Sequence, residues 1–224
     1  MKSPELSETD RFRVGLFDLG LTTLPLLSNL VYFALTAQEY GCSKILDAIA
    51  TTNSEILFIS KLICSTKFIG KLRSLVALSI INCDLDDLFQ LFNDKSTLTY
   101  LRIEYLYNDN YDADNKWNLI QVNTIHLKYF TINNCRIELK FIQFMLNKMK
   151  SLKLFSISAS QADMINAETW KFIIEHSLIN LKIFRFCFDY NNDDVYDEKI
   201  KKIKQFQTEF WWKNNWNLPQ DDGC

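Results

Sequence analysis

The chain has 224 residues and a formal net charge of −2, and 48% of its positions are hydrophobic. This composition excludes a disordered chain and fits one folded unit large enough to bury its own core. The 25 basic and 27 acidic residues show no positive excess of the kind that binds a nucleic-acid backbone, so we expect no nucleic-acid partner. With 5 glycines and 3 prolines, the chain has too few turn formers for a barrel or sandwich of tight hairpins.

The first part of the chain carries no targeting or membrane signal. Residues 1–13 are polar and lack the apolar stretch of a signal peptide. Residues 20–38 are uncharged but are interrupted by Pro25, Ser28 and Asn29, so we interpret them as part of a core and not as a membrane span. We therefore expect a cytoplasmic or nuclear protein with no membrane partner.

A repeated apolar pattern then runs along most of the chain. Its clearest copy is L-x-x-L-x-x-L-x-I-x-x-C-x-L at residues 72–85. The residue equivalent to Leu78 in each copy is called the anchor of that copy. The predicted anchors are Val14, Phe33, Leu57, Leu78, Leu101, Phe130, Phe155 and Phe184. Successive anchors are 19 to 29 residues apart, which is close to the period of leucine-rich repeats.

Each copy predicts a short strand followed by a turn. The anchor and the residue two positions later lie on the same side of a strand, so both are expected in the core. The position five residues after the anchor is expected to be a buried turn position, occupied by Leu62, Cys83, Leu106, Cys135 and Ser160. We therefore interpret Cys83 and Cys135 as buried structural residues and not as nucleophiles or metal ligands.

Helical patterns alternate with the strands. Apolar residues at helical spacing predict helices over 43–51, 85–93, 138–150 and 163–176. A strand and a helix in each copy predict an α/β leucine-rich-repeat solenoid of about seven to eight repeats over residues 1–194. The parallel strands would form a curved inner ribbon, and the helices would lie outside it.

The C-terminal part, residues 195–224, is expected to close the solenoid. Residues 195–216 place Ile200, Ile203, Phe206 and Phe210 along one helical face, opposite several lysines. This favours a capping helix, with Trp211, Trp212 and Trp216 covering the end of the core. A basic amphipathic helix that touches a membrane or a calmodulin-like partner is the alternative.

In the spacing of their apolar residues and cysteines, the repeats resemble the cysteine-containing leucine-rich repeats of F-box substrate adaptors. The typical pattern of those repeats is L-x-x-L-x-L-x-x-C. The resemblance covers residues from about 14 to 190 and extends to the tail that ends in FWWKNNW. It implies a protein-recognition role, as the substrate-binding part of a ubiquitin-ligase adaptor with ligase subunits as partners. We find no F-box in this sequence, so the chain is expected to be a fragment of such a protein or a relative without that module.

In a leucine-rich solenoid, the residues that flank each anchor face outward on the concave side. Tyrosine and arginine are the types enriched where proteins bind each other. We therefore predict that a protein partner contacts this side. The candidate binding residues are Tyr100, Arg102, Glu104, Tyr129 and Arg185.

The sequence lacks the motifs of a cofactor, metal or catalytic site. It has no Walker loop, no G-x-G-x-x-G and no G-x-S-x-G, and His126 and His176 have no partner at metal-ligand spacing. The acidic segment 108–115 does not match a calcium loop and is interpreted as an insertion. We expect no cofactor, no metal and no enzymatic activity. Two alternatives stay open, a structural scaffold solenoid and an enzyme with an unrecognised site.

Overall fold

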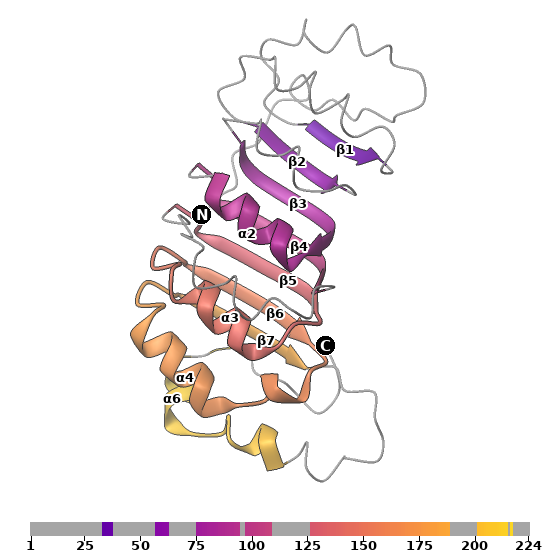
Figure 1. Cartoon of the computed structure of the whole chain (residues 1–224). Helices are drawn as coiled ribbons and strands as arrows, with labels where there is room; N and C mark the ends of the chain where they lie inside the picture. Colours follow the sequence, from indigo (N-terminus) through magenta and orange to yellow (C-terminus); the bar gives the residue numbers. More distant parts are fainter. Residues whose placement is uncertain are drawn as a thin grey trace, which may run out of the picture.

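A parallel β-sheet is the centre of the molecule. The computed structural model describes residues 33–37, 57–62, 75–94, 97–108, 126–188, 201–214 and 216. In these residues seven strands form one sheet, in which each strand pairs in parallel with the next one along the chain (Figure 1). The strands are β1 (Phe33–Ala37), β2 (Leu57–Leu62), β3 (Leu75–Asp84), β4 (Tyr100–Tyr107), β5 (Tyr129–Cys135), β6 (Leu154–Ala159) and β7 (Ile183–Phe188).

Helices connect several of the strands and cover one side of the sheet, which confirms the α/β class (Figure 1). They are α2 (Leu85–Asp94), α3 (Leu139–Leu146), the 3-10 turn η6 (Ala162–Met164), α4 (Ala167–His176) and α6 (Glu209–Lys213). In the described part of the chain, no helix is long and apolar enough to cross a membrane. The predicted anchor Val14, the predicted helix at 43–51 and most of the 108–115 insertion lie outside the described residues.

The predicted helices agree with these bounds to different degrees. The 85–93 prediction matches α2, whereas α3 ends at Leu146, before the expected residue 150. The 163–176 prediction divides into η6 and α4, because Asn166 is extended and caps a new helix that begins at Ala167. The Asn166 side chain accepts a hydrogen bond from the Thr169 backbone N–H at 3.0 Å, as a helix N-cap does.

The register of the sheet tests the anchors directly. Leu78, Leu101, Phe130, Phe155 and Phe184 are paired from strand to strand, as the repeat spacing predicts. The anchor of β2 is an exception, because Ile59 and not Leu57 pairs with both Phe33 and Leu78. A shift of two residues keeps the same strand face, so the apolar pattern alone does not distinguish Leu57 from Ile59.

The buried turn position, predicted five residues after each anchor, is also displaced on two strands. Cys83, Leu106 and Cys135 align across β3, β4 and β5 and are buried, as expected. On β6, however, the equivalent residue is the buried Ala159, and the predicted Ser160 is exposed. The register shifts between Ile132 and Cys135, which moves the partner by one residue. On β2, Leu62 pairs with Ile80 instead of Cys83, again after a register shift.

Aromatic anchors form a continuous column through the core. The rings of Phe130 and Phe155 lie 5.6 Å apart, and those of Phe155 and Phe184 lie 6.1 Å apart. Trp170 of α4 lies 6.0 Å from Phe155 and donates its indole N–H to the Met164 carbonyl at 2.8 Å. The helices are therefore fixed to the sheet by burial of large rings, and the one polar atom of Trp170 is satisfied.

The C-terminal segment packs against β7, but it is not the single helix expected from 195–216. Residues 201–204 are helical, the chain then turns, and α6 begins at Glu209. Phe206 contacts Phe186, while Trp211 and Trp216 both contact Phe184. The prediction that Trp212 also covers this end was wrong, because 70% of its surface is exposed.

Candidate functional site

The sheet face opposite the helices carries the predicted binding residues, and we call it the open face. Alternate burial along each strand separates the two faces, as the pattern of β4 shows. The residue before each anchor belongs to the first row, which is Ala77, Tyr100, Tyr129, Leu154 and Ile183. The residue after each anchor belongs to the second row, which is Ser79, Arg102, Thr131, Ser156 and Arg185. Two residues further on lies the third row, which is Ile81, Glu104, Asn133, Ser158 and the disulfide-bonded Cys187.

Four of the five candidate residues are brought together on two neighbouring strands. Tyr100 of β4 pairs in register with Tyr129 of β5, and their exposed fractions are 37% and 41%. Arg102 and Glu104 follow Tyr100 on the same strand. Arg185 lies apart on β7, three strand spacings or about 14 Å from β4. The candidate residues thus share one face, but a partner must cover four strands to reach all of them.

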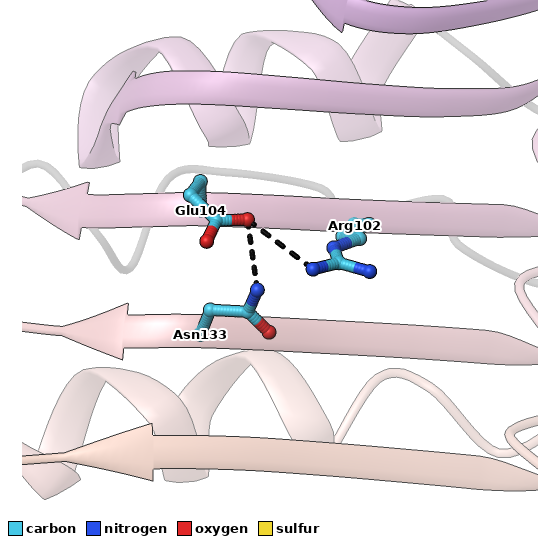
Figure 2. Close-up of polar contacts among 3 residues, drawn as sticks. All are labelled: Arg102, Glu104 and Asn133. Atoms are coloured by element: carbon cyan, nitrogen blue, oxygen red, sulfur yellow. Dashed lines mark hydrogen bonds and ion pairs between the residues drawn. The ribbon is translucent and has the colours of Figure 1, made fainter.

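Glu104 is the centre of a small polar cluster on the open face (Figure 2). Its carboxylate accepts a hydrogen bond from the Asn133 side-chain amide at 2.8 Å and forms an ion pair with Arg102 at 3.4 Å. Both charged side chains are substantially exposed, so the ion pair contributes well under about 1 kcal/mol to stability. The two contacts hold the carboxylate of Glu104 and the guanidinium of Arg102 in defined positions.

The structure adds residues that the sequence did not single out. Asn133 holds Glu104 from the next strand, although its place in the repeat was the only signal for it. Ile183 extends the apolar first row to β7 with 42% of its surface exposed, and Leu154 is half-buried between Tyr129 and Ile183. From Tyr100 to Ile183 the first row is therefore an apolar strip across four strands, exposed at every position except the half-buried Leu154.

The buried thiols of Cys83 and Cys135 have no features of a reactive site. Both cysteines are free and buried. Burial raises the pKa of the Cys83 thiol well above 9.0, and the nearby charges of Asp87 and Asp84 raise it further. Burial raises the pKa of Cys135 to about 12, although a backbone hydrogen bond to Ile137 acts in the opposite direction. Thiols in these environments stay protonated and are poor nucleophiles and metal ligands.

The histidines also lie away from any cluster of ligating groups. His126 is exposed before β5. The ring of His176 stacks on Phe172 of the same helix, with centroids 4.3 Å apart. Among the residues that the structure describes, no three His, Cys, Asp or Glu side chains are grouped as a metal site would require.

Comparison with models of known protein families and with curated proteins found no match to this chain.

Proposed function

We propose that this chain is a leucine-rich-repeat solenoid that binds another protein through the open face of its sheet. The repeated architecture supports the first half of this proposal. Seven parallel strands follow in chain order, and equivalent residues pair from one strand to the next. Each strand and its return segment would form one repeat, and neighbouring repeats would bury the apolar side of each other.

Contacts at repeat spacing give further support. The Ser177 hydroxyl donates to the Asn147 side-chain oxygen at 2.6 Å, and the Asn180 amide donates to the Lys150 carbonyl at 2.9 Å. In both pairs the two residues are 30 positions apart, one more than the spacing of the anchors Phe155 and Phe184, so each contact joins neighbouring units. Such contacts would fix the stacking of neighbouring repeats.

One observation carries the binding proposal, the exposed first row centred on Tyr100 and Tyr129. A large aromatic side chain buries much apolar area at a low cost in conformational entropy, which is why tyrosine is frequent at binding hot spots. On these strands the inward positions already form the core. The outward tyrosines are therefore not needed to build it, and a partner would use them.

The test is quantitative affinity purification of the tagged protein and its Tyr100→Ala/Tyr129→Ala double variant. We expect the partner to be depleted about tenfold or more from the double variant, because loss of a hot-spot side chain costs about 2 kcal/mol. The control is a Phe172→Ala/Ile179→Ala variant, which removes exposed apolar residues from α4 and the turn after it. Equal recovery of every partner by the wild type and the double variant would contradict binding at the open face.

The substrate-binding part of a ubiquitin-ligase adaptor is the more specific form of this proposal. Cys83 and Cys135 favour it, since both are buried at the position where the repeats of F-box adaptors carry cysteine. Such an adaptor works in the cytoplasm or the nucleus, which is the localisation that we propose. Co-purification of Skp1-like and cullin subunits tests the link, and their absence from a complex that retains its other partners would contradict it.

A further inference from the structure

Three lysines, Lys128, Lys153 and Lys182, lie side by side immediately before β5, β6 and β7. The Lys153 backbone N–H donates to the Lys128 carbonyl at 2.8 Å, and the Lys182 N–H donates to the Lys153 carbonyl at 2.8 Å. All three side chains are exposed, and none forms an ion pair within the described part of the chain. Neighbouring strands hold their backbones about 4.8 Å apart. Like charges in adjacent strands repel each other, so this lysine column is electrostatically unfavourable for the isolated protein.

The lysine column borders the apolar first row. Each lysine is followed directly by a first-row residue, and these residues are Tyr129, Leu154 and Ile183. On the other side of the row, Arg185 is exposed and also has no ion pair in the described part of the chain. The backbones of the three lysines therefore lie along one edge of the apolar strip, and Arg185 lies beyond its other edge.

We propose that this surface binds an extended segment of a partner protein that is rich in acidic and apolar residues and crosses strands β4 to β7. This inference rests on the function proposed above and names the chemistry of the partner. Carboxylates of the segment would neutralise Lys128, Lys153 and Lys182, and its apolar side chains would cover the first row. Four strands span about 14 Å, which an extended segment of about five residues covers at its usual rise per residue.

Protein fits this surface better than nucleic acid does. The first row ends in Leu154 and Ile183, which are aliphatic and provide no ring on which a base can stack. Glu104 places a fixed negative charge on the same face, and this charge would repel a phosphate backbone. An acidic peptide accommodates both features, because it combines apolar side chains with charges whose spacing varies with its sequence.

The test is a selection of displayed random linear peptides on the wild-type protein. We expect the enriched peptides to contain an excess of Asp and Glu interspersed with large apolar residues. A fluorescent version of the best peptide is then titrated against a Lys128→Glu/Lys153→Glu/Lys182→Glu variant. Three reversed charges should weaken its binding about tenfold or more, and the wild-type affinity should fall as ionic strength rises. The matched control is Lys201→Glu/Lys204→Glu/Lys213→Glu, which makes the same change of charge at exposed positions in the C-terminal segment and should bind normally.

The outcomes separate this inference from the proposed function. Peptides that need Tyr100 and Tyr129 but show no acidic excess, or that bind the two lysine variants equally, would overturn the acidic-segment inference and leave protein binding intact. Peptides that bind the Tyr100→Ala/Tyr129→Ala variant as tightly as the wild type would overturn both. No enrichment at all would overturn the acidic-segment inference alone. Tighter binding of a fluorescent 20-nucleotide oligothymidine than of the best peptide would overturn the choice of a protein partner.

Discussion

Removal of the Phe155 ring is the sharpest perturbation of the core. Phe155 is fully buried and lies within 6.1 Å of three other rings, those of Phe130, Trp170 and Phe184. Truncation of a buried phenylalanine to alanine costs about 3–5 kcal/mol. The ring contacts of Phe155 favour the upper half of that range, because each aromatic pair adds roughly 0.5–1.5 kcal/mol beyond its buried area. A domain is stable by about 5–15 kcal/mol in total, so Phe155→Ala should remove a large fraction of that stability.

The assay is urea unfolding of the wild type and Phe155→Ala, followed by far-ultraviolet circular dichroism. The control is Phe172→Ala, because Phe172 has the same side chain but is half exposed on α4, and its loss should cost less than about 1 kcal/mol. We expect a clear decrease of the transition midpoint for Phe155→Ala alone. Similar midpoints for the two variants would refute the view that the aligned anchors form the core.

Two further outcomes are expected from single side chains. Burial raises the pKa of Cys135 in the folded protein to about 12, whereas an unfolded chain ionises this thiol near pH 9.0. The contribution of Cys135 to stability is therefore complete below pH 9 and decreases between pH 9 and about 12. The difference in unfolding free energy between the wild type and Cys135→Ala should therefore be smaller at about pH 10.5 than at about pH 8, and a constant difference would contradict the buried neutral thiol. The Asp163 carboxylate accepts a hydrogen bond from the Leu139 backbone N–H at 2.7 Å, at the first residue of α3. Asp163→Ala should cost about 1 kcal/mol and speed amide exchange in α3, whereas Glu175→Ala on the exposed surface of α4 should change neither.

The repeat spacing was sufficient to predict most of the sheet. From Leu78 to Phe184, each anchor is followed two residues later by another buried apolar residue, and this pairing fixes both the strand and its inward face. The spacing failed at β2 because Leu57 and Ile59 are both apolar and share a strand face. The structure distinguishes them only through pairing with Phe33 and Leu78, which is a tertiary interaction.

Two other errors have local physical reasons. Ser160 was expected at a buried position, but an irregularity between β5 and β6 places Ala159 there, and apolar spacing contains no signal for such a shift. Trp212 was expected to cover the end of the core together with Trp211. Consecutive residues on a helix point about 100° apart, and α6 turns Trp211 toward the core and Trp212 away from it.

The candidate site was predictable as a face but not as a set of contacts. Strand alternation alone places Tyr100, Arg102 and Glu104 on the same side. The hydrogen bond between Glu104 and Asn133 joins residues 29 positions apart, and it depends on the register between β4 and β5. The anchors Leu101 and Phe130 give that register, but they do not show which of the facing side chains form a hydrogen bond.

Replacement of the exposed tyrosines of the first row distinguishes a binding module from a passive scaffold. If the chain only supported a larger assembly through its core, Tyr100 and Tyr129 would be replaceable by small polar residues with little effect on any partner. Each tyrosine is more than one-third exposed, so its replacement also costs the fold less than loss of a buried anchor does. A Tyr100→Ser/Tyr129→Ser variant should therefore unfold within about 1–2 kcal/mol of the wild type while losing its partner. Retention of the partner at near-normal stability would favour the scaffold, because only that role leaves these exposed rings without a function.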